Sequence, residues 1–446
     1  MKSAASHKRS IYLPLAVCAI VVLHAFCETA LSEELRIGYS FARKGGGGMA
    51  MATVEADTGK ILSQDIQYQS VYCTAPKKLR SVGDGKTFVM TNDDEMIRTI
   101  FVIDIEDSGR SRVVQMPGVP DEVRVAGTQL VITCSRDFLA TVDINSRRIL
   151  GMWDVSQLLK PPGNHPQDIL VVPDGKHAIV SFQKDSPGGK KLGGRLVVFT
   201  LPGMDVVSDV VLGRDYEHWE LKNSIRKTGP GLELIFLDER NDTVLSTADH
   251  YGAVALLRWS ELFAGKLNTL EYLSTATDRS WGYSFPDRGV QFEIGSNSYC
   301  LVCNAGADGG AVIVDLEQWK IVHRMRTRFG LEKPIFLPEL GKAFSSCPGK
   351  HKTRVRSEVV KKYEPHPVLS VFDFDETDIA KTSVRPIRMK ANLFQIGVLH
   401  RDGRTPLFIM SCGQDAGTRV LIFDPATERL LDDQSAIGAV VQFERN

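Results

Sequence analysis

Side chains that could do chemistry gather in three segments near the middle of the chain, and one histidine precedes them. The segments are 213–230, 248–252 and 274–287, and they combine His, Asp, Arg and Trp. Residues of these types bind ligands, hold metal ions or transfer protons. The candidate ligand-binding residues are His165, His218, Trp219, Asp249, His250, Arg279 and Trp281.

Two interpretations of these residues stay open. A metal or acid–base site would use His165, His218, Asp249 and His250, which lack a local spacing such as HExxH. Alternatively, His, Asp and Trp on loops bond and pack neighbouring sheets together. The sequence therefore identifies no catalytic residue, predicts no metal ligand and indicates no cofactor.

Basic residues form a second group of candidates. Three segments rich in Gly or basic residues are 42–48, 185–195 and 348–366. If these loops converge, their positive charge could bind an anionic glycan, a lipid head group or an acidic protein. The alternative is a solvated charged loop. The candidate anion-binding residues are Lys190, Lys191, Arg195, Lys350, Lys352, Arg354 and Arg356.

The elements that must position these residues are short β-strands. The template is HPQDILVVPDGKHAIVSF at 165–182, in which two apolar runs flank Asp174-Gly175. Asp-Gly between apolar runs predicts a β-hairpin, because Gly adopts positive φ without a Cβ clash. Two further strands are expected at 195–200 and 206–212, which makes a four-stranded unit.

The four-stranded unit repeats at a spacing near 50 residues, which predicts a β-propeller. Its hairpins are expected at 76–92, 120–134, 165–182, 231–247, 288–303, 334–347 and 392–412. An eighth hairpin is split between the termini, with 437–446 as its first strand and 35–41 as its second. We therefore expect an all-β fold with eight four-stranded blades. Seven blades are possible if 213–290 is miscounted, and a two-domain β protein is the alternative.

The repeats resemble those of YVTN-type propellers, which include lactonase-like proteins and the heavy chain of quinoprotein amine dehydrogenases. The resemblance is carried by 165–182 and, less closely, by 76–92. The sequence Tyr-Val-Thr-Asn that ends the family repeat is replaced here by Ile179-Val180-Ser181-Phe182. Such motifs build blades and imply the fold, but they imply no particular activity.

The cysteines are expected to be structural. Cys300 and Cys303 match CxxC in letters only, because they fall in a predicted strand, where residues three apart point to opposite faces. Redox CxxC motifs instead open helices. Cys134, Cys303, Cys347 and Cys412 each end the second strand of a unit, which is typical of a small buried side chain. Equivalent strands of neighbouring blades are too far apart for a disulfide.

Composition and the N-terminus bear on location and partners. The 446 residues include 54 basic and 54 acidic residues, a balance that argues against nucleic-acid binding. A basic start followed by the apolar segment 11–26 predicts a signal peptide over 1–32, with the propeller over 33–446. An uncleaved anchor is the alternative. No later apolar run is long enough to span a membrane. With the predicted signal peptide, we expect a secreted or periplasmic protein. We also expect a monomer.

These features favour an exported scaffold that binds a partner through its loop-rich face. A lactonase-like or other hydrolase, with its active site at the axial mouth of the propeller, is the alternative, so the sequence leaves enzymatic activity open. An electron-transfer subunit is a third class, and Asn304 stands where a CxxCH haem motif would need His.

Overall fold

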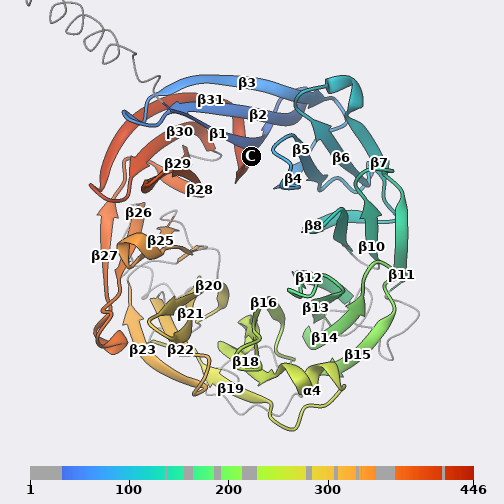
Figure 1. Cartoon of the computed structure of the whole chain (residues 1–446), viewed down its shortest axis with the longest axis vertical. Coiled ribbons are helices and arrows are strands. Elements are labelled where there is room, and N and C mark those ends of the chain that lie inside the picture. Colours follow the sequence, from blue (N-terminus) through green and yellow to red (C-terminus); the bar gives the residue numbers. More distant parts are fainter. Residues whose placement is uncertain are drawn as a thin grey trace, which may run out of the picture.

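The fold is a closed ring of antiparallel β-sheets around a central opening (Figure 1). The computed structural model describes residues 33–135, 138–154, 164–184, 192–212, 229–277, 284–305, 310–327, 331–332, 334–347, 367–413 and 417–445. The predicted signal peptide, 1–32, lies outside these ranges. No helix among the described residues is long and apolar enough to cross a membrane.

Six of the sheets contain four strands that pair in chain order or its reverse. The first three are β4 (Pro76–Ser81), β5 (Thr87–Asn92), β6 (Thr99–Asp104) and β7 (Arg112–Gln115); β8 (Val119–Ala126), β9 (Gln129–Ser135), β10 (Phe138–Asp143) and β11 (Ile149–Asp154); and β12 (Asn164–Val171), β13 (His177–Lys184), β14 (Leu192–Thr200) and β15 (Val206–Val211).

The next three sheets complete this series. They are β16 (Leu232–Asp238), β17 (Thr243–Ala248), β18 (Ala253–Arg258) and β19 (Glu271–Ser274); β20 (Pro286–Ile294), β21 (Asn297–Asn304), β22 (Gly310–Asp315) and β23 (Lys320–Arg326); and β24 (Pro334–Leu337), β25 (Lys342–Cys347), β26 (Val368–Asp373) and β27 (Ser383–Arg388). Helical segments are short: η1 (Ser108–Arg110), η2 (Asp249–Tyr251), α4 (Trp259–Phe263), η3 (Pro338–Leu340) and η4 (Ile379–Lys381).

The remaining sheet joins the two ends of the chain. It contains seven strands in the order β28-β29-β30-β31-β1-β2-β3. The strands are β28 (Asn392–Arg401), β29 (Arg404–Gly413), β30 (Gly417–Asp424), β31 (Arg429–Arg445), β1 (Glu34–Arg43), β2 (Gly46–Glu55) and β3 (Ile61–Ser70). β31 pairs with β30 mainly through 429–435 and with β1 through 439–445, antiparallel in both cases.

The shared strand β31 decides the blade count. Hydrogen bonding among the described residues gives seven sheets, but the seven-stranded sheet contains two four-stranded units when β31 is counted in both. Blade 1 is the C-terminal half of β31 with β1, β2 and β3, blades 2 to 7 are the four-stranded sheets in chain order, and blade 8 is β28 to β31. The predicted pairing of 437–446 with 35–41 is confirmed, with Tyr39 opposite Phe443.

The template hairpin forms as its sequence predicts. β12 and β13 pair with Ile169 opposite Val180, and Gly175 in the connecting turn has a φ of 65°. Positive φ is costly for a residue with a Cβ, which explains the glycine at this position. The Asp174 carboxylate accepts hydrogen bonds from the Lys176 and His177 backbone N–H groups at 2.7 and 3.1 Å, which fixes the turn.

A β-bulge recurs in the first strand of the blades and sets a common level around the ring. After the bulge, a backbone N–H donates to a hydroxyl on the second strand. The pairs, at 2.9 to 3.1 Å, are Lys78–Thr91, Glu122–Thr133, Asp168–Ser181, Leu234–Thr247 and Gln395–Ser411. In blade 1 a register shift places Gln442 opposite Ser40 at the same step. These first-strand residues are therefore structurally equivalent, one from each of six blades.

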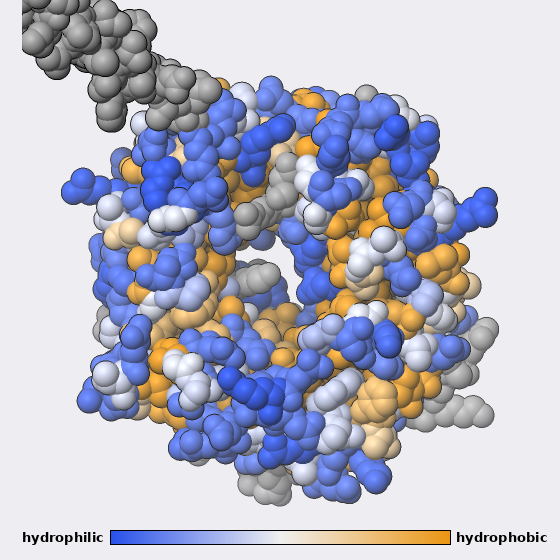
Figure 2. All heavy atoms as spheres, in the orientation of Figure 1, coloured by the Kyte–Doolittle hydropathy of each residue, from blue (hydrophilic) through white to orange (hydrophobic). Residues whose placement is uncertain are grey.

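Hydrophobic packing between adjacent blades forms the core. In one cluster, Leu245 and Val254 of blade 5 pack with Val302 and Val312 of blade 6. Another combines Leu139 of blade 3 with residues of blade 4. Burial of each side chain of this size stabilises the folded protein by about 1.5–3 kcal/mol. The ring is therefore held by repeated sheet-to-sheet interfaces rather than by one central core, because its centre is open (Figure 2).

The cysteines among the described residues are buried, as predicted for those that end a second strand, and no disulfide joins them. They are Cys73, Cys134, Cys300, Cys303, Cys347 and Cys412. Cys300 packs between blades 5 and 6, whereas Cys303 packs between blades 6 and 7, so the CxxC side chains do point to opposite faces. Burial raises the pKa of Cys73 and of Cys134 to about 12.

These thiols should not react while the protein is folded. A thiol needs its thiolate form to attack a reagent, and burial disfavours both access and ionisation. At neutral pH we expect iodoacetamide to label none of the six in the native protein and all six in guanidinium chloride, as read by peptide mass spectrometry. Rapid labelling of Cys300 or Cys303 without denaturant would contradict this packing.

Candidate functional site

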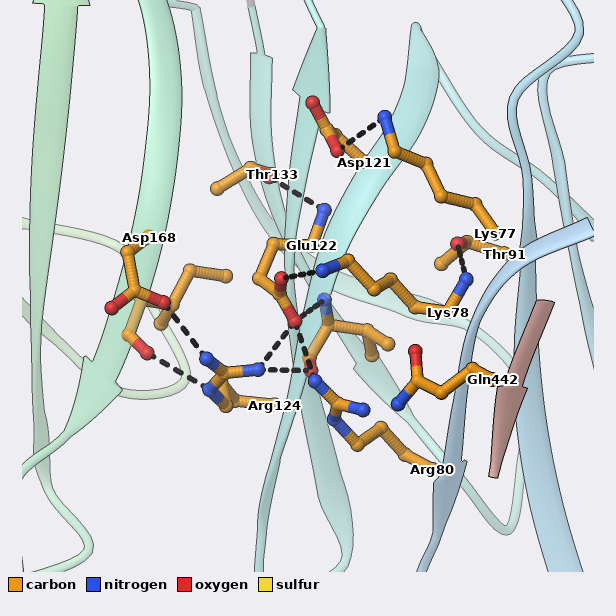
Figure 3. Close-up of polar contacts among 12 residues, drawn as sticks. Lys77, Lys78, Arg80, Thr91, Asp121, Glu122, Arg124, Thr133, Asp168 and Gln442 are labelled. Atoms are coloured by element: carbon orange, nitrogen blue, oxygen red, sulfur yellow. Dashed lines mark hydrogen bonds and ion pairs between the residues drawn. The ribbon is translucent and has the colours of Figure 1, made fainter. Parts of the chain in front are cut away.

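A connected group of polar side chains lies on the first strands of blades 1 to 4 (Figure 3), and these strands line the inner edge of the ring (Figure 1). We call Lys78, Arg80, Glu122, Arg124 and Asp168 the channel-wall cluster. Lys78 and Arg80 belong to β4, Glu122 and Arg124 to β8, and Asp168 to β12. The bulge described above places Lys78, Glu122 and Asp168 at one level, so these strands present their charges side by side.

Glu122 is the centre of the cluster. Its side chain is almost buried, and Lys78 Nζ and Arg80 Nη2 contact its carboxylate at 2.8 and 2.9 Å. Arg124 Nη1 donates to the same carboxylate. Burial alone would raise the pKa of Glu122, but the charges of Arg124, Lys78 and Arg80 outweigh it and lower the pKa to about 2. The carboxylate is therefore ionised at any physiological pH.

Arg124 connects blade 3 to blade 4. Its Nη2 lies 2.8 Å from Asp168 Oδ1, and its Nε donates to the Ile169 carbonyl at 3.1 Å. Asp168 in turn accepts the Ile235 backbone N–H at 3.1 Å, which links blade 4 to blade 5. Burial raises the pKa of Asp168, although the Arg124 charge opposes this shift. One chain of polar contacts thus joins three consecutive blades.

Blade 1 joins the cluster through the C-terminal strand. Gln442 Nε2 donates to the Leu79 carbonyl at 3.0 Å, and Glu444 lies 3.6 Å from Arg80 Nη1. Gln442 lies opposite Ser40 on the neighbouring strand, so it occupies the position in blade 1 that Lys78 occupies in blade 2. The strand that closes the ring therefore also completes one end of the charged wall.

The cluster lies toward the loop-rich face of the ring. Lys77, the residue before Lys78, contacts Asp121 at 2.7 Å and Asp93 at 3.2 Å. Asp93 follows β5, in the connection between the second and third strands of blade 2. In an antiparallel blade those connections share a face with the links between blades. The charges therefore stand near the axial mouth on that face.

First strands in the opposite half of the ring also make apolar contacts with one another. A Cβ on Gly289 of β20 would lie 3.2 Å from the Phe236 ring of β16, so the glycine makes room for the aromatic side chain. The rings of Phe292 and Phe336, from β20 and β24, lie 5.0 Å apart. Blades 5 to 7 therefore add apolar contacts to the inner wall, and they also contribute an ion pair there, between Arg288 of β20 and Glu332 at 3.8 Å.

The opening at the centre of the ring is visible in the space-filling view, and hydrophilic atoms border it on the side of β4 and β8 (Figure 2). The side chains of Lys78 and Arg124 retain 31% and 30% exposure, whereas Glu122 retains 7%. The wall therefore presents cations toward the opening and keeps their main counter-charge behind them.

Two of the predicted ligand-binding residues are described with their side chains, and both are buried. Asp249 is fully inaccessible, and its Oδ1 lies 3.3 Å from Nε2 of His250. The imidazole stacks edge-on against Phe285, with ring centroids 5.7 Å apart. Gly231, with a φ of 62°, approaches this pair so closely that a Cβ would clash with the His250 ring. The pair is buried in the connection between β17 and β18, beside Phe285.

The other predicted ligand-binding residues lie outside the described residues or side chains. His165 is the second residue of β12, but its side chain lies outside the described part. Four further residues lie outside it entirely: His218, Trp219, Arg279 and Trp281. Their convergence with Asp249 and His250 stays a prediction. Among the described residues, no three His, Cys, Asp or Glu side chains are close enough together to hold a metal ion.

Of the predicted anion-binding residues, the structure describes Arg195. It lies in β14, is almost buried, and its Nη1 contacts Asp209 at 3.1 Å. Burial lowers the pKa of this guanidinium and raises the pKa of Asp209, while their mutual attraction opposes both shifts. The remaining six lie outside the described residues: Lys190, Lys191, Lys350, Lys352, Arg354 and Arg356.

Sequence reasoning missed the channel-wall cluster, although a signal for it was present. Three first strands have, at or near their start, a proline followed by two polar residues and an apolar one: Pro76 to Leu79, Pro120 to Val123 and Pro166 to Ile169. The third residue of each motif is Lys78, Glu122 or Asp168. Charged residues at an equivalent position of successive repeats, with Arg80 and Arg124 two residues further on, predict ion pairs between neighbouring blades once the repeats are aligned.

Comparison of the sequence with family models and with curated proteins gives no match. Solved structures do match. Dihydro-heme d1 dehydrogenase NirN, in complex with DHE, has a TM-score of 0.64 and 10% identity over 91% of this chain and 74% of its own. Apo AztD from Citrobacter koseri has a TM-score of 0.54 and 12% identity over 92% and 98%.

The computationally designed protein Ika8 is similar in the same way. Its TM-score is 0.53, with 10% identity over 83% of this chain and 90% of the designed one. Identities this low carry information on the fold and not on the activity. Together with the ring of four-stranded units, these likenesses show that the chain folds as a β-propeller.

Proposed function

We propose that the protein is an exported, non-enzymatic binding scaffold that holds an acidic protein partner against its loop-rich face. The supporting observation is the strand order of the blades. The three basic segments 42–48, 185–195 and 348–366 each fall between the second and third strands of a blade, namely β1–β2, β13–β14 and β25–β26. Connections of this type emerge from one face of the ring.

The closed ring suits a scaffold role because it is rigid where the loops are attached. Binding residues commonly stand on loops that a stable framework positions. In the described turn between β1 and β2, Arg43 and Lys44 are exposed, and the Arg43 guanidinium lies over the Phe41 ring at 5.5 Å. Positive charge gathered on one face attracts an acidic partner and speeds their encounter.

Export belongs to the same proposal. It rests on the predicted signal peptide over 1–32, and an extracellular or periplasmic scaffold would meet its partner there. One fold can host many unrelated functions, so the propeller is compatible with this role without specifying it.

Deletion of 350–362 tests the proposal. The deletion removes six basic residues and one acidic residue from a connection between strands. We expect the full-length protein to bind heparin resin at low salt and the deletion variant to pass through or elute at clearly lower salt, because surface charge pairs are screened by salt.

A matched control removes positive charge from the opposite face. Lys86 and Lys176 follow the turns between the first and second strands of their blades, so Lys86→Gln with Lys176→Gln should leave the elution unchanged. Equal retention of the deletion variant and the wild-type protein would refute binding through these loops.

A further inference from the structure

Lys78 and Arg80 form a pair of cations with donor capacity left over. They stand two residues apart on β4, so their side chains leave the same side of the strand, and both contact the Glu122 carboxylate. The Lys78 ammonium contacts Glu122 at 2.8 Å, which uses one of its three N–H donors. Among the described residues, two donors of this ammonium are then available to a ligand.

Arg80 is similarly placed. Its guanidinium has five N–H donors, of which one bonds the Leu79 carbonyl and one bonds Glu122, each at 2.9 Å. Glu444 lies farther away, at 3.6 Å from Nη1. The planar guanidinium therefore keeps donors for a second oxyanion without giving up its bond to Glu122.

The position of this pair makes it accessible. β4 is the first strand of its blade and lies at the inner edge of the ring, beside the central opening (Figures 1 and 2). The side chains of Lys78 and Arg80 retain 31% and 16% exposure, whereas Glu122 retains 7%. Glu444, 3.6 Å from Arg80, retains 26% exposure, so Lys78 is the cation of the pair whose counter-ion among the described residues is buried.

The charges of the cluster are balanced, and among the described residues Lys78 is the cation with the fewest carboxylate contacts. Three cations, Lys78, Arg80 and Arg124, share the single carboxylate of Glu122. Asp168 and Glu444 lie at the two ends of this group, and burial raises the pKa of Asp168. Three cations and three carboxylates therefore balance within the cluster. Among the described residues, Lys78 contacts one of these carboxylates, whereas Arg80 and Arg124 each contact two.

We propose that Lys78 and Arg80 form a seat for an oxyanion group, carboxylate or phosphate, of a small molecule that enters the axial opening. Their N–H donors would bind the oxyanion directly, and Glu122, buried behind them, would hold both cations in place. The seat lies on the wall of the opening and is separate from the loop surface proposed above for a protein partner.

Calorimetric titration of the purified full-length protein with inorganic phosphate, and separately with succinate, tests the seat. Both titrations are made at constant ionic strength with chloride as the balancing anion. We expect saturable binding with a Kd of about 1 mM for at least one of the two. Phosphate and succinate distinguish a phosphorylated ligand from a carboxylic acid.

Substitutions assign the binding to these residues. Lys78→Gln should raise the Kd about tenfold, as expected for the loss of one charge-assisted hydrogen bond, and Lys78→Arg should restore binding to within about threefold. Lys86→Gln, which removes an exposed cation paired with Glu106, should leave the Kd unchanged. A cooperative thermal transition in each variant shows that the ring is intact.

Two outcomes would overturn the seat: no saturable binding of either anion, or equal affinity in wild type and Lys78→Gln. The two proposals also fail separately. Deletion of 350–362 should weaken heparin retention and leave phosphate binding unchanged. Lys78→Gln should weaken phosphate binding and leave heparin retention unchanged. If both variants lost both properties together, phosphate would be binding at the basic loop, and the seat on β4 would be wrong.

Discussion

A chain that ends at Gly438 should lose most of its stability against unfolding. The truncation removes 439–446, which include the strand that pairs with β1 from Ala439 opposite Ala42 to Arg445 opposite Ile37. It deletes Val440 and Phe443 from the core and uncovers Tyr39. Each such side chain is worth about 1.5–3 kcal/mol, and the backbone of β1 would become an open edge.

The free energy of unfolding of a whole domain is only about 5–15 kcal/mol. We therefore expect the truncated chain to show no single cooperative unfolding transition at 37 °C. Denaturant unfolding followed by tryptophan fluorescence measures it. Phe443→Ala keeps the backbone pairing and should cost about 3–5 kcal/mol, while Leu430→Ala, at an exposed position of the same strand, should cost less than about 0.5 kcal/mol. If the truncated chain unfolded with the same free energy as the wild-type protein, closure of the ring by β31 would be contradicted.

Glu122→Gln should be the most damaging single change in the channel-wall cluster. It leaves Lys78, Arg80 and Arg124 facing one another without their shared counter-charge. Breaking a buried ion pair by removing one partner costs about 3–5 kcal/mol, and the partial exposure of the three cations reduces this to about 3 kcal/mol. Chemical denaturation at pH 7 gives the value. Glu106→Gln, in an exposed pair with Lys86, is the control and should have no measurable effect.

The pH dependence gives an independent check on Glu122. Its folded-state pKa is about 2, below its ordinary value of 4.5. A depressed pKa contributes stability above the unfolded pKa, and that contribution is lost as the pH falls through the folded pKa. The difference in unfolding free energy between wild type and Glu122→Gln should therefore be constant from pH 7 to about 5 and shrink between about 4.5 and 2. A constant difference down to pH 2 would contradict the ion-pair account.

Local signals in the sequence explain why the blades could be predicted. Asp174-Gly175 between two apolar runs specifies a hairpin within 18 residues, and the same pattern recurs along the chain. The closure of the ring was predictable because 437–446 and 35–41 each supply half of one such pattern, and β31 does pair with β1. The shared use of β31 by two blades was not predictable, because it depends on one long strand changing partners between 435 and 439.

The channel-wall cluster was harder to predict because its contacts join separate repeats. Arg80 and Glu122 are 42 residues apart, and Arg124 and Asp168 are 44 apart. Each residue by itself reads as an ordinary polar residue near the start of a strand. Only the repeated bulge brings them to one level, and a bulge depends on backbone register, which sequence pattern specifies weakly. The histidine-based site, in contrast, was inferred from residue types on loops, and it stays a prediction.

Hydrogen exchange of the C-terminal strand tests the central claim most directly, since the whole arrangement depends on the ring being closed by β31 and β1. Amide exchange followed by mass spectrometry should show 439–445 protected to the same degree as 37–42, because the two segments share one ladder of hydrogen bonds. Complete exchange of 439–445 within seconds, while 37–42 stays protected, would contradict the closed ring.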